Sequence, residues 1–392
     1  MKTLHIVPYF SPAWAYGGIP RIVIGLVGAL ARRWPEVWVL TTEAGSEGKR
    51  EPSGGEGGNY RVVVLPNLSN YLADRFQFFL PRGTHEFFRK RIADFDLVHI
   101  HGCHHLLGVF AYSFLQRERI PYVISPYGTA PRIERHQAAK WVFDRLFWDR
   151  VFFQARHYHA LSRLEKDQLQ DLGISPEKIS VIYPGVNLEE FSEIPPRGEF
   201  RRRYRIPETD KVILYLGRIS PRKGIEHLLQ AFGAIGGNGF RLVIAGNDWG
   251  YQAFLERLAR QQGISGRIVF TGLLSGKERL SAYVDADLLV YPSTLEAFGL
   301  VPVEALLCGT PVIITRQSGC AEILGKIGDV PIIEYGDVPG LKKCILGNLG
   351  KKVPESAKDF LRRELDWANL AEEMTGLYAR AGRENAPRPG SG

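Results

Sequence analysis

Two successive series of apolar, strand-like segments, each alternating with helix-like segments, constrain the fold of this chain more than any other feature. A run such as 96–101 (Asp-Leu-Val-His-Ile-His) is apolar enough for burial on both faces, which is typical of a parallel sheet covered by helices. In the first series, strands are expected at 3–9, 37–42, 61–66, 96–101 and 121–125, and a helix at 19–33. The second series predicts strands at 212–217, 240–246, 267–272, 288–292 and 311–315. The sequence therefore predicts an α/β protein with two doubly wound domains.

A proline-rich segment lies between the two series. Two adjacent prolines in 194–198 (Ile-Pro-Pro-Arg-Gly) remove backbone donors and block helix formation, so this segment is predicted to be a linker. We expect one domain at 1–193 and the other at 199–365. The glycine-rich stretch 45–59 is predicted to be a flexible loop, and the tail 385–392 is predicted to be disordered.

The composition of the 392 residues excludes several classes of protein. No stretch approaches the roughly 18 uncharged apolar residues of a membrane-spanning helix. The first ten residues lack the cleavage site of a signal peptide, which predicts a cytoplasmic location. The four cysteines are far apart and form no C-x-x-C pair, which indicates reduced thiols; they are Cys103, Cys308, Cys320 and Cys344.

The net charge of +8 favours an acidic partner, such as a phosphate, a nucleic acid or an anionic lipid. Most of the excess positive charge lies between Arg75 and Arg156, a stretch that contains 13 basic and 7 acidic residues. Within it, 140–156 mixes Trp and Phe with Lys and Arg, and its apolar side chains point to both sides of a helix. This favours a packed helix; the alternative is a face for an anionic membrane surface or a lipid-linked acceptor, which would make the protein peripheral on the inner face of the membrane. No RNA-binding signature accompanies the charge, so no nucleic-acid partner is expected.

Two glycine-containing turns follow predicted strands, where doubly wound domains bind their ligands. Gly17 and Gly18 precede a helix whose free N–H groups could hold an anion, although the pair also suits a tight strand-to-helix turn. The motif Gly217-Arg218-x-x-x-x-Lys223-Gly224 opens the second domain. Its cations and the following helix N-terminus could neutralise a diphosphate without a metal, and the alternative is a solvated basic turn.

A third motif, Glu296-x-Phe298-Gly299-Leu300-x-x-x-Glu304, follows the strand expected at 288–292. Its carboxylates could accept hydrogen bonds from hydroxyl groups, while the amides near Gly299 and Leu300 could face an anion. A sugar nucleotide supplies both kinds of group. The alternatives are a glutamate that complements the helix dipole and a surface glutamate.

The order of these motifs resembles glycosyltransferase family four, the retaining nucleotide-sugar transferases of GT-B fold. The segments 181–187 (Val-Ile-Tyr-Pro-Gly-Val-Asn) and 318–322 (Ser-Gly-Cys-Ala-Glu) support the resemblance, which covers almost the whole chain. It implies two facing Rossmann-like domains with an interdomain cleft, and a last helix at 367–381 that returns to the first domain. It also implies a nucleotide-sugar donor, a glycan, lipid-linked or small-molecule acceptor, and neither a metal nor another cofactor.

The resemblance assigns a role to each motif. Arg218 and Lys223 hold the donor diphosphate and stabilise the leaving nucleotide, and Glu296 contacts the donor sugar. Glu304 contacts the ribose hydroxyls, and the glycine pair closes on the donor from the opposite domain. The donor-binding residues implied in this way are Gly17, Gly18, Gly217, Arg218, Lys223, Glu296, Phe298, Gly299, Leu300 and Glu304.

One position departs from the family pattern. Where the family reads Pro-His-Gly, this chain has Pro126-Tyr127-Gly128. A phenol titrates near 10 and is a poor proton shuttle at neutral pH. Tyr127 is therefore expected to keep contact with the sugar but to lose any role that needs an imidazole. This leaves three hypotheses: a retaining glycosyltransferase, an impaired protein that only binds a sugar nucleotide, or a GT-B epimerase or phosphorylase.

Five potential metal ligands crowd one predicted strand end, namely His99, His101, Cys103, His104 and His105. Their spacing matches no standard zinc pattern, so zinc is the minor hypothesis. His99 and His101 share one face of the strand. We predict that His101 contacts donor or acceptor as a catalytic residue beside Tyr127; the alternative is a hydrogen-bonded histidine of the core.

Overall fold

The computed structural model describes residues 1–10, 18–44, 60–71, 73, 79–131 and 141–383. The chain divides into two units, Met1–Gly185 with Trp367–Gly392, and Val186–Asp366. The first unit ends before the proline-rich segment 194–198, which belongs to the second. The glycine-rich stretch 45–59, the tail 385–392 and Gly17 all lie outside the described residues.

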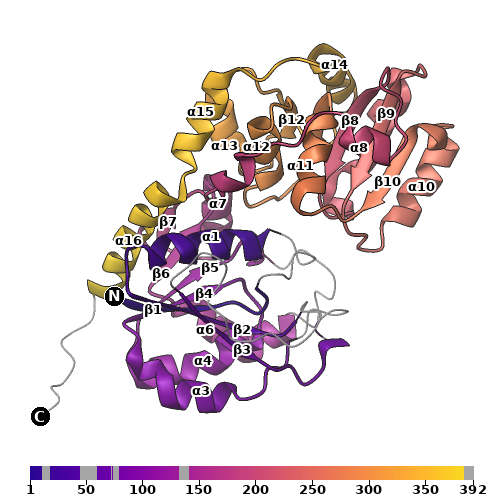
Figure 1. Cartoon of the computed structure of the whole chain (residues 1–392). Helices are drawn as coiled ribbons and strands as arrows, with labels where there is room; N and C mark the ends of the chain where they lie inside the picture. The colour runs from indigo at the N-terminus through magenta and orange to yellow at the C-terminus, as the bar shows by residue number, and fades with distance from the viewer. Residues whose placement is uncertain (11–17, 45–59, 72, 74–78, 132–140, 384–392) are drawn as a thin grey trace, which may run out of the picture. The chain divides into compact units, whose positions relative to one another are not determined.

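The first unit is built on a parallel seven-stranded sheet in the order β3-β2-β1-β4-β5-β6-β7. Helices α1 and α16 cover one face of this sheet, and α3 and α4 cover the other (Figure 1). Double coverage explains why β4 is buried at every position. The strands are β1 Lys2–Ile6, β2 Glu36–Thr42, β3 Arg61–Leu65, β4 Leu97–His101, β5 Tyr122–Ser125, β6 His157–Ala160 and β7 Ile179–Val181. The helices are α1 Ile19–Ala31, α3 Thr84–Arg91, η2 Ile92–Asp94, α4 Leu106–Arg117, η3 Asp144–Trp148, α6 Asp149–Phe153, α7 Arg163–Asp171, η4 Pro176–Lys178 and α16 Trp367–Arg383.

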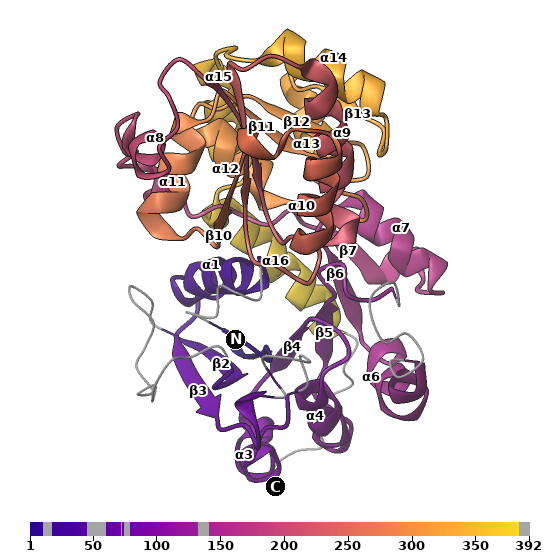
Figure 2. The ribbon, with the colours of Figure 1, turned by 90° about the vertical axis from the view of Figure 1, so that its right-hand side faces the viewer.

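The second unit contains a parallel six-stranded sheet in the order β10-β9-β8-β11-β12-β13. Helices α9, α10 and α14 lie on one face of it, and α11 and α12 on the other (Figure 2). The strands are β8 Lys211–Leu216, β9 Phe240–Ala245, β10 Ile268–Gly272, β11 Leu288–Tyr291, β12 Val312–Thr315 and β13 Ile332–Ile333. The helices are η5 Leu188–Phe191, α8 Glu199–Arg203, η6 Pro221–Lys223, α9 Ile225–Ile235, α10 Gln252–Gln261, η7 Ser265–Arg267, α11 Gly276–Asp285, α12 Leu300–Leu307, α13 Ala321–Leu324, η8 Gly325–Ile327, α14 Val338–Asn348 and α15 Glu355–Glu364.

Both sheets have a point where the strand order reverses. In the first unit it lies between β1 and β4, and in the second between β8 and β11, because each later strand pairs beside the first strand of its series. In open parallel sheets, ligands bind beyond the carboxyl ends of the strands at such a point. The prediction of two Rossmann-like sheets is confirmed, and it directs attention to these two places.

The C-terminal helix α16 completes the first unit. Its first residue, Trp367, occupies a slot between Gly25 of α1 and Gly185, where a Cβ atom at either glycine would lie within 2.4 Å of the indole. Arg33, just after the end of α1, also donates to the backbone oxygen of Ala368 at 3.2 Å. Glycine at position 25 weakens the middle of a helix, and the close approach of the indole explains its presence.

Residues 141–153 form a helical segment that includes a π-helical turn, η3. One side is buried, with Trp148, Val151 and Phe152 in the core of the first unit. The other side exposes five large apolar side chains, and we call it the exposed aromatic face; its members are Trp141, Val142, Leu146, Phe147 and Phe153. The prediction of a packed helix thus holds for the buried side of this segment and is wrong for the exposed aromatic face.

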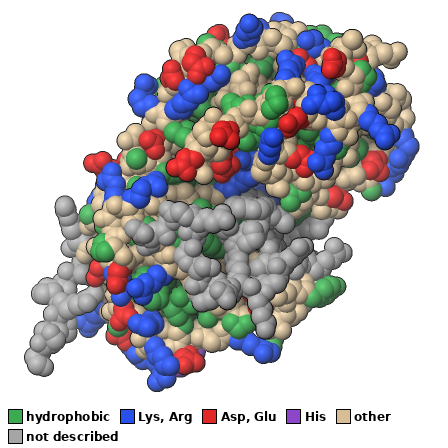
Figure 3. All heavy atoms as spheres, in the orientation of Figure 1, with side chains coloured by type: hydrophobic (Ala, Val, Ile, Leu, Met, Phe, Trp, Pro, Cys, Tyr) green, Lys and Arg blue, Asp and Glu red, His purple; other side chains and the backbone are tan. Residues whose placement is uncertain are grey.

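Charge on the visible face of the second unit is dispersed. Lys and Arg side chains there are interspersed with Asp and Glu side chains (Figure 3). Within the described part of the chain, no helix has both the length and the apolar character that spanning a bilayer requires.

Candidate functional site

The site in the second unit forms where the loops after β8 and β11 meet. The loop after β8 runs through the short helix η6 to Gly224, which adopts a left-handed conformation at φ 62° before α9. A Cβ atom at Gly224 would lie 2.2 Å from the carbonyl oxygen of Pro292, so only glycine lets the two loops approach so closely. The amide of Thr294 also donates to the carbonyl of Arg222 at 3.0 Å.

Lys223 and Glu296 form an ion pair between these loops. Both Lys223 Nζ, at 3.4 Å, and the carboxylate Oε2 of Glu296, at 3.0 Å, contact the Tyr291 hydroxyl at the end of β11. The Lys223 side chain is 9% exposed and that of Glu296 is 22% exposed. The motifs that the sequence places 73 residues apart are therefore in contact.

The electrostatics of this pair are those of a buried, oppositely charged couple. Burial and the nearby Arg218 guanidinium lower the pKa of Lys223, and the carboxylate of Glu296 opposes this shift. Burial raises the pKa of Glu296, but the charges of Lys223 and Arg218 outweigh burial and leave it lowered. Burial, followed by the Glu296 charge, raises the pKa of Tyr291 well above its usual range. Its hydroxyl therefore stays protonated and donates a hydrogen bond to the Glu296 carboxylate.

Arg218 lies on the same loop, four residues before Arg222. Its guanidinium carbon lies 4.7 Å from the centre of the Trp249 ring, on the loop after β9. Its backbone oxygen accepts a 2.7 Å hydrogen bond from the Tyr215 hydroxyl. Sequence reasoning missed Trp249; its position just after the strand next to β8 was the available signal.

The loop after β11 leads into α12 through a left-handed Gly299, with φ 91°. Phe298 is buried, and its carbonyl accepts a 2.7 Å hydrogen bond from the Cys320 amide. The backbone of Glu296 likewise pairs with the segment after β12, with Gly319 N donating to Glu296 O at 2.9 Å. These bonds fix the loop, so that Leu300 begins α12 at the carboxyl edge of the sheet.

Glu304, on α12, is buried in a separate polar network. Its carboxylate accepts from Arg279 Nη1 at 3.3 Å and from the Tyr283 hydroxyl at 2.7 Å, both on α11. Arg279 in turn donates to Glu190 at 2.5 Å. The sequence did not indicate Arg279 or Tyr283, because neither belongs to a recognised motif.

In the first unit, a chain of hydrogen bonds runs from α16 into the sheet. Its direction follows from its end, because the carbonyl of Ile182 can only accept, so His159 Nε2 donates to it at 2.9 Å. Ser125 then donates to His159 Nδ1 at 2.7 Å, His99 Nε2 donates to Ser125 at 2.6 Å, and the Tyr378 hydroxyl donates to His99 Nδ1 at 2.6 Å. Burial lowers the pKa of His159 to about 4 and that of His99 well below 6.5, so both rings are neutral.

His101 and Tyr127, which the sequence analysis named separately, lie in contact. His101 Nδ1 lies 2.7 Å from the Tyr127 hydroxyl, and its Nε2 lies 2.9 Å from His5 Nδ1. Tyr127 adopts a left-handed conformation, with φ 57°, and the next amide, Gly128 N, donates to the buried Glu165 carboxylate at 2.5 Å. Burial lowers the pKa of His101 and raises that of Tyr127, so neither is poised near neutral pH.

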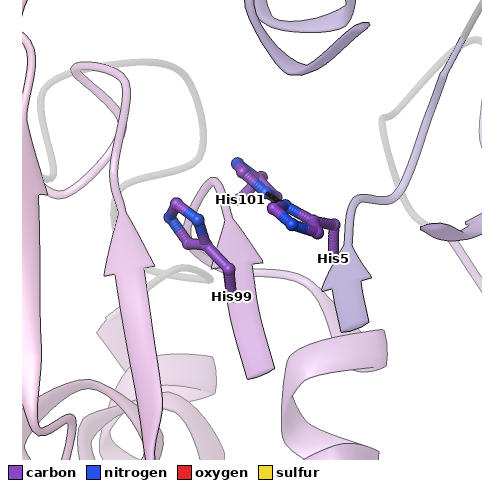
Figure 4. Close-up of side chains that lie close together, drawn as sticks. All are labelled: His5, His99 and His101. Atoms are coloured by element: carbon purple, nitrogen blue, oxygen red, sulfur yellow. Dashed lines mark hydrogen bonds between the residues drawn. The ribbon is translucent and has the colours of Figure 1, made fainter. Parts of the chain in front are cut away.

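Three of the buried histidines are grouped closely enough to suggest a metal site. One nitrogen from each of His5, His99 and His101 lies within 4.8 Å of the others, on β1 and β4 (Figure 4). Both nitrogens of His99 and of His101, however, already form hydrogen bonds to protein groups. This favours hydrogen-bonded core histidines over metal ligands.

The other residues of the predicted zinc cluster at 99–105 do not join this histidine group. His104 pairs with Asp144 at 2.6 Å and with the Thr129 carbonyl at 2.8 Å. His105 accepts from the Gly108 amide at 3.1 Å. The cluster that the sequence suggested as a zinc site is thus divided among three separate sets of contacts. Of the predicted glycine pair, Gly18 is the N-cap residue of α1. Its backbone has the conformation of an ordinary helical residue, with φ −76°.

Two family models match most of the chain. Residues 16–190 match the family described as Glycosyltransferase Family 4, and residues 196–330 match that described as Glycosyl transferases group 1. A D-inositol 3-phosphate glycosyltransferase of Corynebacterium efficiens is 26% identical over 97% of this chain and 95% of its own length. An uncharacterized glycosyltransferase of Methanocaldococcus jannaschii is 32% identical, over 56% of this chain and 58% of its own length.

A solved structure shares the fold over the whole chain. The Anabaena protein HepE in complex with UDP-glucose superposes with a TM-score of 0.71 at 18% identity, covering 97% of this chain and 99% of that one. At this identity the likeness concerns the fold alone. The two family matches cover most of both units, and the chain therefore belongs to glycosyltransferase family 4, enzymes of GT-B fold.

Proposed function

We propose that the protein is a retaining transferase that moves a sugar from a nucleotide-diphosphate sugar to a glycan, a lipid-linked or a small-molecule acceptor. The observation that carries the proposal is the buried ion pair of Lys223 and Glu296, with Arg218 beside it, at the point where the strand order of the second sheet reverses. The relatives described above, among them a D-inositol 3-phosphate glycosyltransferase, support a sugar transfer.

The chemistry follows from the charges. Breaking a glycosyl phosphate bond leaves a diphosphate anion and a sugar with cationic character. The cations of Arg218 and Lys223 would offset the negative charge as it develops, in a partly buried site where electrostatic attraction is stronger than in water. Because side chains supply this charge, we propose that transfer needs no metal. Glu296 holds Lys223 in place and offers acceptor oxygens to a sugar hydroxyl.

We also propose roles for the other donor-binding residues that the family resemblance implies. The amides near Phe298, Gly299 and Leu300 would face the donor phosphate, and Gly217 allows its approach beside β8. Glu304 would accept from the ribose hydroxyls, with Arg279 and Tyr283 fixing the orientation of its carboxylate.

In the first unit, we propose that the Tyr127 hydroxyl contacts the sugar, and that His101 orients it. The donor role of the Gly17 and Gly18 pair also remains a prediction. The competing function, a sugar-nucleotide-binding protein without transferase activity, is motivated by Tyr127 in place of the family histidine. The two functions can be told apart by one measurement, because a protein that only binds a sugar nucleotide would bind a donor but show no acceptor-dependent turnover.

Donor binding is the direct test. In calorimetric titrations with UDP-, GDP- and ADP-sugars in EDTA, we expect one class of donor to bind the wild-type protein. Lys223→Ala and Glu296→Ala should each weaken that binding at least about tenfold, because each removes a charged or hydrogen-bonding partner of the ligand and leaves the other buried charge unpaired. Phe254→Ala, an exposed aromatic of α10, is the matched control and should bind as the wild type does. Failure of every donor to bind, or binding that appears only when a divalent metal replaces EDTA, would contradict the proposal.

The exposed aromatic face gives the acceptor side a second proposed partner. Its five apolar side chains are 47% to 60% exposed, and Arg145 and Arg150 lie exposed among them. Soluble surfaces rarely gather so many large apolar groups, whereas an interfacial helix combines such groups with basic ones. We propose that this face rests on an anionic membrane, which places the enzyme on the inner membrane face with access to a lipid-linked acceptor.

Vesicle co-sedimentation tests this surface. The wild-type protein should sediment with vesicles of equal parts phosphatidylglycerol and phosphatidylcholine. The double variant Arg145→Glu/Arg150→Glu should bind about 30-fold more weakly, because each basic residue near an anionic surface contributes about 1 kcal/mol. Leu346→Ser, which alters an exposed leucine of the second unit, is the control. Equal binding by the double variant, or no sedimentation of the wild type, would contradict membrane binding through this face.

A further inference from the structure

We infer that Trp249 is the positioning residue for the cation that meets the donor diphosphate. The inference rests on the proposed function, in which Arg218 is that cation. An arginine side chain loses about 2 kcal/mol of rotamer freedom when it is fixed. A site that uses its guanidinium therefore gains from a contact that fixes it beforehand.

The backbone on both sides of this contact is rigid. The amide of Ile219 donates to the Asn247 carbonyl at 2.8 Å, and the amide of Trp249 donates back to Ile219 at 3.0 Å. A Cβ atom at Gly246 would lie 1.7 Å from the carbonyl oxygen of Gly217, so the two loops approach so closely that no side chain fits at position 246. Backbone hydrogen bonds thus hold the loops after β8 and β9 together.

The next residues extend this rigidity to α10. Asp248 accepts from the amides of Tyr251 and Gln252, at 2.8 and 3.0 Å, and so fixes the loop onto the start of that helix. Trp249 consequently projects from a segment that is held at both ends.

The geometry of the stack suits the cation's task. The guanidinium of Arg218 lies over the indole of Trp249, with 4.7 Å between its carbon and the ring centre. Stacking uses the flat face of the guanidinium and leaves its N–H groups, which lie in the plane, able to donate. Among the described residues, the structure gives this guanidinium no hydrogen bond or ion pair, although its charge is felt by both Lys223 and Glu296. Trp249 therefore orients the cation without occupying its donors.

The test compares the binding of the nucleoside diphosphate (UDP, GDP or ADP) whose sugar binds the wild type with that of its nucleoside. Trp249→Ala should weaken diphosphate binding about tenfold, which corresponds to about 1.4 kcal/mol, and leave nucleoside binding unchanged. Trp249→Phe, which keeps a ring under the cation, should recover most of the loss. The double variant Trp249→Ala/Arg218→Ala should bind no more weakly than Arg218→Ala alone, because the indole acts only through the arginine.

The outcomes separate this inference from the function on which it rests. If Arg218→Ala leaves diphosphate binding unchanged, the proposed role of Arg218 fails. If Arg218→Ala weakens binding but Trp249→Ala does not, the positioning role fails while the function stands. Additive losses in the double variant, or a loss of nucleoside affinity in Trp249→Ala, would instead make Trp249 a direct ligand contact and overturn the inference. Thermal melting of each variant checks that it is folded.

Discussion

Turnover is expected to fall about 100- to 1,000-fold when Lys223 is replaced by methionine. This is the usual loss when one preorganised group that stabilises developing negative charge is removed. Methionine keeps most of the volume of the side chain, so the change removes the charge rather than the packing. The measurement is kcat with saturating donor and acceptor, where a loss confined to KM would contradict a role in the transition state.

The same variant leaves the Glu296 carboxylate without its partner in a mostly buried position, and breaking such a pair costs about 3–5 kcal/mol of stability. The double variant Lys223→Met/Glu296→Gln removes both charges and should recover the stability but not the turnover. Lys277→Met, at an exposed lysine paired with Glu199, controls for the substitution itself and should keep full activity. Recovery of turnover in the double variant would show that the pair serves the fold alone.

Acidification is expected to unfold the first unit well before the second. Burial lowers the pKa of five histidines of the first unit; they are His5 and His105, to about 3, His159, to about 4, and His99 and His101, by a large amount. Each is neutral in the folded protein but takes up a proton near pH 6.5 when unfolded. The stability that each contributes is therefore complete above pH 6.5 and is lost as the pH falls toward its folded pKa.

At pH 5 the loss is about 2 kcal/mol for each of His5, His105 and His159, since one pH unit corresponds to about 1.36 kcal/mol, and the lowered pKa values of His99 and His101 act in the same direction. Glu165 acts in the opposite direction, because burial raises its pKa to about 7 and the folded state binds its proton first. A single group cannot offset five, so the summed loss approaches the whole stability of a typical domain.

Calorimetric melting between pH 8 and pH 4.5 checks this expectation. The transition of the first unit should move steeply downward below pH 6.5, while that of the second unit, whose sequence contains only His227, should move little. His5→Asn should make the pH dependence less steep by about one proton, and His227→Gln should leave it unchanged. Parallel shifts of both transitions would show that the histidines are not the cause.

Much of the fold followed from the sequence because the buried strands of a parallel sheet are long apolar runs. The strands that were missed are short or polar. In β6, His157 and His159 interrupt the apolar pattern, and their burial depends on hydrogen bonds to Ser180 and to the backbone of Ile182, which only the folded chain supplies. The two-residue β13 is too short to show any periodicity.

The motifs of the site were found in the sequence, but their contacts were not. Lys223 and Glu296 meet because β11 pairs beside β8, and strand order is a property of the whole sheet. Trp249 belongs to no motif and acquires its significance only from the neighbouring strand. The family fixed the reaction class, whereas the acceptor depends on surfaces that no short motif encodes.

The exposed aromatic face was mispredicted for a geometric reason. Helical spacing places Trp141, Trp148 and Phe152 on one stripe only if every turn has 3.6 residues. The π-helical turn Asp144–Trp148 contains more residues than an α-helical turn, so the residues after it point in a different direction around the helix axis. Trp148 and Phe152 are therefore buried while Trp141 is exposed.

The return of α16 to the first unit has a consequence for how the chain is made. The second unit is continuous in sequence, from Val186 to Asp366, whereas the first requires residues from both ends of the chain. During synthesis the second unit can therefore fold while the slot between Gly25 and Gly185 still lacks Trp367. The first unit, whose sheet is synthesised first, is therefore completed last, when α16 emerges and Trp367 fills the slot.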